Sequence, residues 1–313
     1  MTTPPQDRTL AAAGLIGIYA VLVGYTDNQL RQVAALGGLF QFHATRSVLA
    51  LALLAVVAPL LGLRLRPRSW GAVGLRCALH GVAMLAYFAA LAILPVAQVL
   101  AGLFTAPIFA LLIERLALRR PIGPVRVVAV ALGFAGVVLV LGPDALAGAG
   151  VAVVLPVASG LLYALGHVVT REACPGESAA SLLAGFFAGL LVLGLAGMAV
   201  LAIWPQPVAQ GAAGFALRGP VVPSADVLFW VALQACGAVL GVRLMIRAYQ
   251  IGTTSRVSVF EYLLLPVSAG WGWLLWGERL GPAALAGMGL IALAGSLIAL
   301  RAVQPALGAP AGA

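Results

Sequence analysis

Several ionisable and polar side chains lie inside otherwise apolar stretches of the sequence. Arg76, His80 and Tyr87 are spaced by four and seven residues, which places them on one face of a helix. Tyr163 and His167 are spaced in the same way in a later apolar stretch. A charge inside a membrane helix costs about 2.5–3.5 kcal/mol on insertion scales, so such residues tend to face a cavity or a partner. We expect these stripes to line a polar cavity, with structural hydrogen bonding as the alternative.

A carboxylate and a second arginine lie at a depth similar to that of Arg76. Glu261 precedes Tyr262 near the start of one apolar stretch, and Arg243 lies toward the end of the preceding one. The helical rise places both about 8–10 Å from the same side of the membrane. Glu261 is expected to pair with Arg76 or Arg243 in a structural ion pair, to meet a cationic substrate group, or to take up and release a proton.

The first apolar stretch ends in a polar element that contains Asp27 and Asn28. Asp27 and Arg31 are four residues apart and are expected to pair. Arg46, near the start of the second stretch, is expected to have a structural or topological role. Trp271 belongs to a tryptophan cluster that predicts an interfacial belt, or a side chain that closes a cavity from outside.

The composition shows that lipid must surround most of these elements. Of the 313 residues, 63% are hydrophobic and 9% are charged, against about 25% charged residues in soluble domains. This excludes a soluble enzyme, a disulfide scaffold and a disordered chain. All 18 basic residues are arginine, a usage typical of a GC-rich bacterial genome, and the three cysteines form no metal-binding or disulfide pattern.

The apolar stretches predict an all-α integral membrane protein with ten transmembrane helices. The predicted spans are 10–32, 40–62, 70–93, 96–115, 123–141, 149–170, 179–203, 224–248, 256–276 and 282–301. With the N-terminus inside, twelve arginines lie at inner positions and three at outer positions. This bias predicts that both termini are cytoplasmic, in the inner membrane of a bacterium, and it explains the basic excess without nucleic acid.

The two halves of the sequence resemble each other. A shift of 159 residues places Pro107 on Pro266 and the segment 130–141 on 289–300. Two tandem repeats of five spans each must have opposite orientations in the membrane. We therefore expect two inverted five-helix repeats, residues 10–142 and 143–301, between short cytoplasmic tails at 1–9 and 302–313. Pro107 and Pro266 are expected to bend their helices, either as hinges or as static kinks.

The ten spans, the repeat, the segment Ala90–Pro95 and the segment Trp276–Gly281 together resemble the drug/metabolite transporter superfamily, with two EamA-type domains. The resemblance implies a central cavity lined mainly by helices 1, 3, 4, 6, 8 and 9. One departure is Arg119, which stands where the shift of 159 would place a counterpart of Glu278. The substrate-binding residues expected on this basis are Asp27, Asn28, Arg76, His80, Tyr87, Gln98, Tyr163, His167, Arg243, Glu261, Tyr262 and Trp271.

The leading functional hypothesis is a secondary transporter that exports small polar metabolites, amino acids or related compounds, by alternating access. One alternative is a carrier for a cofactor-type or cationic metabolite such as S-adenosylmethionine. A different class is an intramembrane enzyme or a membrane scaffold. Enzyme signatures such as a P-loop, HExxH or GxSxG are absent from the sequence, and the expectation is a non-enzyme without cofactor or metal. The expected partners are a small-molecule substrate and the lipid bilayer.

Overall fold

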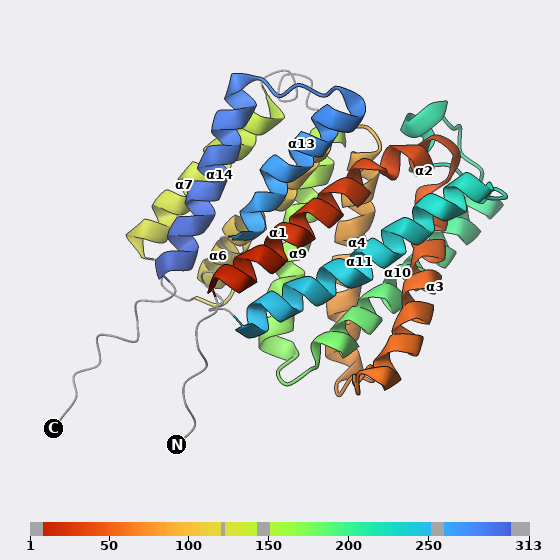
Figure 1. The fold of residues 1–313 in the computed structure, drawn as a ribbon, viewed down its shortest axis with the longest axis horizontal. Coiled ribbons are helices and arrows are strands. Elements are labelled where there is room, and N and C mark those ends of the chain that lie inside the picture. The colour runs from red at the N-terminus through yellow and green to blue at the C-terminus, as the bar shows by residue number, and fades with distance from the viewer. Residues whose placement is uncertain (1–8, 120–122, 143–150, 252–259, 302–313) are drawn as a thin grey trace.

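The computed structural model describes residues 9–119, 123–142, 151–251 and 260–301. These residues form helices joined by loops, most of them short (Figure 1). The helices of the first half are α1 (Thr9–Asn28), α2 (Leu30–Leu36), α3 (Leu39–Leu60), α4 (Trp70–Leu91), α5 (Val96–Leu103), α6 (Ala106–Leu116) and α7 (Pro124–Leu141). The second half contains α9 (Val151–Ala173), α10 (Ala179–Ile203), the 3-10 helix η1 (Gly211–Gly214), α11 (Ala225–Ile251), the 3-10 helix η2 (Glu261–Leu263), α13 (Leu264–Trp276) and α14 (Pro282–Arg301).

Each of the ten predicted spans contains a helix. Seven helical segments of the described residues are long and apolar enough to cross a membrane. The other three predicted spans, 123–141, 256–276 and 282–301, correspond to α7, α13 and α14, which have shorter apolar stretches. The first part of the span predicted at 256–276 lies outside the described residues. The chain is thus an all-helical, multi-pass membrane protein.

Three spans are interrupted where a continuous helix was expected. The first turns at Gln29, between α1 and α2. The fourth breaks between α5 and α6, where Thr105 turns its hydroxyl onto the Gly102 carbonyl and Pro107 occupies the first turn of α6. The ninth span passes from η2 into α13, and Pro266 lies in the first turn of α13. Proline has no N–H to donate, so a helix start is where it costs least.

Eight of the helical spans contact one another in a closed ring, and α7 and α14 form a pair beside it (Figure 1). The ring order is α13, α1, α11, α3, α10, α4, α9 and the α5–α6 span, which contacts α13 again. Helices from the two halves of the sequence therefore alternate along much of the ring. A space enclosed by the ring is bordered by both halves.

Small residues allow several of these helices to approach closely. Gly185 and Gly189 on α10 face Cys77 on α4, where an added Cβ would lie 3.0–3.1 Å from side-chain atoms. Gly237 and Gly241 on α11 face α1 in the same way, against Thr26 and Val23. The GxxxG patterns at 185–189 and 237–241 thus lie at helix crossings.

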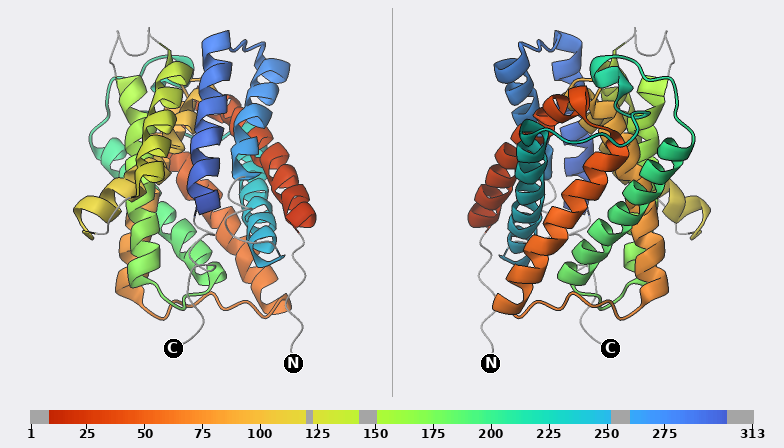
Figure 2. Two further views of the ribbon diagram at one scale, coloured as in Figure 1. Left: turned by 90° about the vertical axis from the view of Figure 1, so that its left-hand side faces the viewer. Right: turned by 90° about the vertical axis from the view of Figure 1, so that its right-hand side faces the viewer.

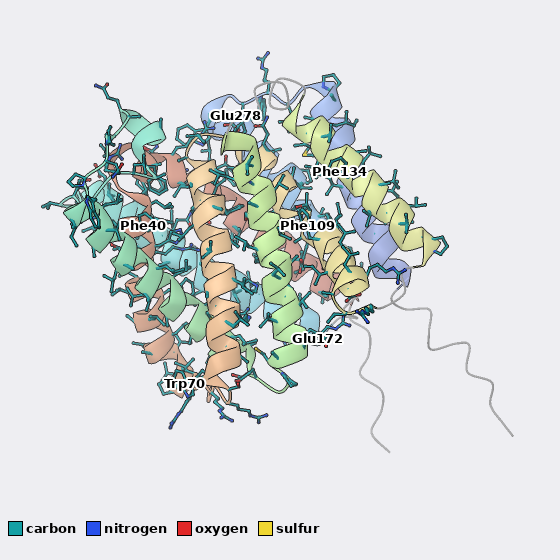
Figure 3. All side chains as sticks on the ribbon, turned by 180° about the vertical axis from the view of Figure 1, so that it is seen from behind. Phe40, Trp70, Phe109, Phe134, Glu172 and Glu278 are labelled. Atoms are coloured by element: carbon teal, nitrogen blue, oxygen red, sulfur yellow. The ribbon has the colours of Figure 1, made fainter. Side chains whose placement is uncertain are left out.

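The two ends of the helical bundle differ. Trp70 and Glu172 lie at one end and Glu278 at the other (Figure 3). Helix α1 begins and α14 ends toward the Trp70 side (Figure 2). The loop with Arg64, Arg66 and Arg68 directly precedes Trp70, so we call this the Arg-rich end.

A long loop after α10 covers the end opposite the Arg-rich end. Arg218 in this loop donates hydrogen bonds to the carbonyl oxygen of Ala34 in α2 and to that of Gly37, which lies between α2 and α3. Phe215 is fully buried, with its ring centre 6.2 Å from that of Phe42. The loop therefore fastens α2 and α3 together and closes the bundle on this side.

At the Arg-rich end, Glu177 fastens the loop before α4 to the start of α10. Its Oε1 accepts hydrogen bonds from the backbone N–H groups of Arg68 and Ser69, at 2.7 and 2.8 Å, and its Oε2 accepts one from the Ser181 hydroxyl. The Ser69 N–H bond is the main reason why the pKa of the Glu177 carboxyl is lowered below its usual 4.5. The ionised carboxylate is thus the form that the fold prefers.

We expect Glu177→Gln to lower the melting temperature of the detergent-solubilised protein at pH 7. Because the pKa of Glu177 is lowered in the folded state, its contribution is fully present above the usual value of 4.5 and is lost as pH falls through the folded-state pKa. The difference between variant and wild type should therefore shrink in acid. A difference of equal size at pH 7 and at acidic pH would show that the carboxylate charge does not act here.

Candidate substrate pocket

A pocket of about 320 Å³ lies inside the ring of helices. Residues from α1, α3, α4, α5, α9, α10, α11 and α13 line it, and none of the lining residues that the structure describes comes from α7 or α14. Most of its wall is apolar or aromatic, for example Tyr19, Met84, Phe88 and Phe186. The polar groups gather at its two ends. A concave, mostly apolar site with a few placed polar groups is typical of small-molecule binding.

One end of the pocket is bordered by Asp27, Arg46, Tyr87 and Gln234. The Tyr87 hydroxyl donates a 2.7 Å hydrogen bond to the Asp27 carboxylate. The Gln234 amide donates to the Thr26 carbonyl oxygen, which fixes α11 to α1. All four side chains are almost fully buried. We call this the buried end of the pocket.

Arg76 and His80 border the other end. The Arg76 guanidinium donates to the Thr170 hydroxyl at 2.9 Å and to the Leu182 carbonyl at 3.1 Å. The pocket lining continues from there to Ala179, the exposed first residue of α10. The pocket is therefore open toward the Arg-rich end and closed at Asp27.

Two histidines and a tyrosine cluster beside Arg76. His80 Nδ1 lies 3.0 Å from the Arg76 carbonyl oxygen. The His80 ring centre lies 4.9 Å from that of Tyr163 and 5.2 Å from that of His167. Tyr163 lines the pocket, and His167 packs behind it. The two stripes expected from the sequence thus meet across the contact between α4 and α9.

Several of the expected site residues lie outside the pocket lining. Gln98 is half-buried on α5, Arg243 is exposed on α11, and Tyr262 stacks near Phe104 with ring centres 5.2 Å apart. Trp271 donates to the Val21 carbonyl and fixes α13 to α1. Glu261 is half-buried on η2.

The two ion pairs expected from the sequence have different outcomes. Arg76 donates to α9 and α10, and Arg243 is exposed on α11; the pairing expected of either arginine with Glu261 stays a prediction. The expected Asp27–Arg31 pair does not form among the described residues, because the turn at Gln29 interrupts the helical spacing on which it depended. Asp27 instead accepts from Tyr87 on α4.

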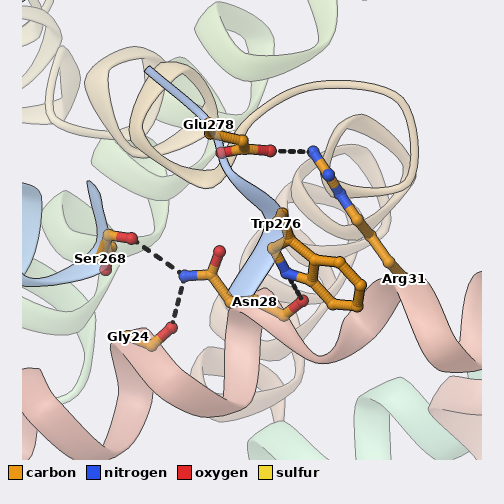
Figure 4. Close-up of polar contacts among 6 residues, drawn as sticks. All are labelled: Gly24, Asn28, Arg31, Ser268, Trp276 and Glu278. Atoms are coloured by element: carbon orange, nitrogen blue, oxygen red, sulfur yellow. Dashed lines mark hydrogen bonds and ion pairs between the residues drawn. The ribbon is translucent and has the colours of Figure 1, made fainter. Parts of the chain in front are cut away.

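Five residues close the bundle beyond the buried end of the pocket (Figure 4). This closing cluster consists of Asn28, Arg31, Ser268, Trp276 and Glu278. Arg31 pairs with the Glu278 carboxylate, and its guanidinium carbon lies 5.7 Å from the centre of the Trp276 ring. The Asn28 amide donates to the Ser268 carbonyl at 3.0 Å, and the Trp276 indole donates to the Asn28 carbonyl. Every one of these contacts joins α1 or α2 to α13 or its following loop.

Arg46 and Gln234 border the pocket although the sequence reasoning did not select them. Arg46 was assigned a structural role because the resemblance placed helix 2 at the periphery, whereas α3 belongs to the ring. An arginine inside an apolar segment tends to face a cavity or a partner, and this signal could have identified Arg46 as a pocket residue. Gln234 is uncharged and belongs to no motif, so only the packing of α11 against α1 reveals it.

Comparisons with known proteins agree with this architecture. Residues 9–142 match the model of the EamA-like transporter family. An uncharacterized transporter of Helicobacter pylori strain J99 is 27% identical over 82% of this chain and 84% of the relative. A riboflavin transporter of Rhizobium johnstonii is 30% identical over 64% of this chain and 61% of the relative. A solved crystal structure matches with a TM-score of 0.61 at 16% identity, over 93% of this chain and 97% of that one, which supports the fold alone.

A multi-pass helical bundle with an internal pocket, matched along most of its length by transporters, defines a membrane carrier and not an enzyme. The first half of the chain, residues 9–142, belongs to the EamA-like transporter family, and the transporters to which the chain is similar extend over most of its length.

Proposed function

We propose that the protein carries a small organic metabolite across the bacterial inner membrane by alternating access, and that the substrate binds in the pocket between two inverted repeats, residues 10–142 and 143–301. The pocket, enclosed by helices of both halves and open at one end, is the observation that carries the proposal. Transporters of inverted-repeat architecture bind their substrates at the interface of the repeats.

The helix contacts support the inverted repeat. Exchanging the halves pairs α1 with α9, α3 with α10, α4 with α11, the α5–α6 span with α13, and α7 with α14. Under this exchange the ring of helix contacts maps onto itself in reverse order, and the α7–α14 pair maps onto itself. Two unrelated sets of five helices have no reason to pack with this symmetry.

Further details that match between the two halves also support the inverted repeat. With a shift of 159 residues, Thr105, just before α6, corresponds to Leu264 at the start of α13. Pro107 and Pro266 thus occupy equivalent first turns, and we assign both as hinges. A shift of 140 residues places Arg31 on Arg171, which pairs with Glu114 on α6 at 2.7 Å as Arg31 pairs with Glu278.

The arginine distribution assigns the Arg-rich end to the cytoplasm, with both termini on that side. The structure then corresponds to an inward-open state, because the pocket reaches the exposed Ala179 at this end. The closing cluster seals the outer side. A transport cycle must break the closing cluster and close the pocket near Arg76.

The pocket dimensions favour an elongated, amphipathic substrate. Arg76 and Tyr87 border opposite ends and are eleven residues apart on α4, which corresponds to about 16 Å along a helix. Between these polar ends the wall is aromatic and apolar. A flat ring system with a polar tail has this shape, and two relatives are riboflavin transporters, from Rhizobium johnstonii and Brucella anthropi. We therefore propose a cofactor-type metabolite as substrate, with riboflavin as the first candidate.

Amino acids and related compounds, moved outward, are the second candidate. The buried end offers a carboxylate, Asp27, and a guanidinium, Arg46, in one pocket. This combination is complementary to the ammonium and carboxylate groups of a zwitterion.

Flux into and out of proteoliposomes tests the proposal, with riboflavin, S-adenosylmethionine and a panel of amino acids as labelled substrates. We expect saturable riboflavin flux above that of empty liposomes, with competition by unlabelled riboflavin. Amino-acid flux in its place would support the second candidate, and the direction of net flux under an imposed gradient would test export. Absence of flux for every substrate, with folded protein in the liposomes, would contradict the proposed function.

A further inference from the structure

Arg46 is a buried cation whose hydrogen-bonding groups are largely unused. Its side chain is 7% exposed and lines the buried end of the pocket. Its Nε and Nη1 atoms are buried, and neither has a hydrogen-bond partner in the described part of the chain. A guanidinium carries five N–H donors in a rigid fork, and leaving buried donors unpaired is costly.

Aromatic rings hold the Arg46 guanidinium in place without using its donors. The guanidinium carbon lies 5.7, 4.9 and 5.8 Å from the ring centres of Phe42, Phe88 and Phe187. Cation–π contacts attract the guanidinium charge without giving its N–H groups a hydrogen-bond acceptor. The rings come from α3, α4 and α10, so three helices fix the position of one arginine.

The nearby carboxylate does not satisfy Arg46. Asp27 is close enough for its charge to interact with Arg46, but the two form no ion pair within 4 Å among the described residues. The Asp27 carboxylate accepts from Tyr87, and Gln234 lies beside it. The buried end therefore holds a donor group and an acceptor group that face the same space without neutralising each other directly.

We infer that Arg46 and Asp27 together bind the polar edge of the substrate, with Arg46 donating to an oxygen of the substrate and Asp27 accepting from an adjacent N–H group. This inference rests on the proposed function and specifies the substrate class as molecules with an acceptor oxygen next to an N–H donor. Such groups would give Arg46 the partners that it lacks in the protein. The aromatic wall beyond would cover the apolar part of the molecule.

Two kinds of metabolite carry this edge. The imide of a flavin presents two carbonyl oxygens on either side of one N–H. An α-amino acid presents a carboxylate next to an ammonium group. Both kinds of metabolite would make the same contacts with Arg46 and Asp27, so the experiment must distinguish flavins from amino acids.

The test measures binding to purified protein in detergent, with riboflavin and its N3-methyl derivative as probes in one arm and L-leucine and leucinamide in the other. We expect Arg46→Met to weaken the binding of the recognised probe by about 10- to 100-fold, the loss typical of a charge-assisted hydrogen bond. Arg46→Lys should recover part of the loss, because it keeps the charge without the fork. Asp27→Asn should weaken riboflavin binding but should not further weaken binding of N3-methylriboflavin, which has no N–H at this position.

Melting of the ligand-free variants separates binding from a structural role. Removing an unpaired buried charge should leave the melting temperature unchanged or raise it, whereas removing a structural arginine would lower it. Arg66→Met serves as the matched control, because Arg66 lies exposed in the loop at the Arg-rich end, away from the pocket. This variant should bind as the wild type does.

The outcomes separate the inference about Arg46 and Asp27 from the proposed transport function on which it rests. If the wild type binds a probe and Arg46→Met binds it equally well, the inference is wrong and the proposed function stands. Lower melting of Arg46→Met with unchanged binding would also overturn the inference and make Arg46 structural. If the wild type binds and transports none of the probes, the proposed substrate class fails and the inference fails with it.

Discussion

A disulfide between α1 and α13 is expected to abolish transport, and its reduction is expected to restore it. Gly24 on α1 faces Ser268 on α13, and a Cβ added at Gly24 would lie 2.8 Å from the Ser268 hydroxyl oxygen. In a disulfide, the Cβ of one residue lies about 3 Å from the sulfur of the other. The same Cβ would lie 3.3 Å from the Ser268 Cα, so Gly24→Cys combined with Ser268→Cys brings the two thiols within reach of a disulfide once α1 and α13 yield by a few tenths of an ångström.

The expected loss of flux follows from the position of this bond. Ser268 belongs to the closing cluster and Gly24 lies next to it; the Asn28 amide donates to the carbonyl oxygens of both residues (Figure 4). If the outer side must open in each cycle, a covalent link here stops the cycle in the inward-open state. Flux in proteoliposomes should fall to the level of empty liposomes after oxidation and return after treatment with a reducing agent.

A second disulfide provides the matched control. Gly133 on α7 faces Ala294 on α14, and a Cβ added at Gly133 would lie 3.4 Å from that of Ala294. No described side chain of either helix lines the pocket, so Gly133→Cys with Ala294→Cys should keep its flux when oxidised. Both pairs require replacement of the native Cys77, Cys174 and Cys236 by alanine. Full flux through the oxidised Gly24–Ser268 variant would show that α1 and α13 do not separate during transport.

Helical periodicity alone was sufficient to predict the main polar stripe of the pocket. Arg76, His80 and Tyr87 all line it, because their spacing on a single helix fixes their common face whatever the helix packs against. Tyr163 was found in the same way. The ten helical segments followed from hydropathy, because lipid allows few alternatives to a helix.

Helical periodicity could not predict which residues far apart in the sequence contact each other. Arg31 pairs with Glu278, 247 residues away, because the turn at Gln29 redirects α2 and the loop after α13 brings the carboxylate to it. The spacing of four residues favoured Asp27 as the partner of Arg31, but Asp27 accepts a hydrogen bond from Tyr87 instead. The inward position of Arg46 depends on how α3 packs between α10 and α11, which no periodicity of α3 itself encodes.

The contact of α5 with α9, on which the pocket wall depends, has no room for a side chain at Gly102. A Cβ added at Gly102 would lie 2.2 Å from the Cβ of Pro156 and 2.9 Å from its Cα. On the other side, a Cβ at Gly160 would lie 2.6 Å from the Gly102 carbonyl oxygen. Backbone therefore meets backbone at this crossing, and no flexible side-chain end can move aside.

We expect Gly102→Val to destabilise the protein by about 3 kcal/mol or more, at the upper end of overpacking effects, because α5 and α9 would have to separate. Such a change should appear as poor recovery of monodisperse protein in detergent and a markedly lower melting temperature. Gly17→Val is the control, since nothing lies within 4 Å of a Cβ at Gly17 on α1 and valine has a slightly better helix propensity than glycine. Equal melting of the two variants would show that α5 and α9 are not packed backbone to backbone, and that the wall of the pocket between Leu100 and Tyr163 is placed differently.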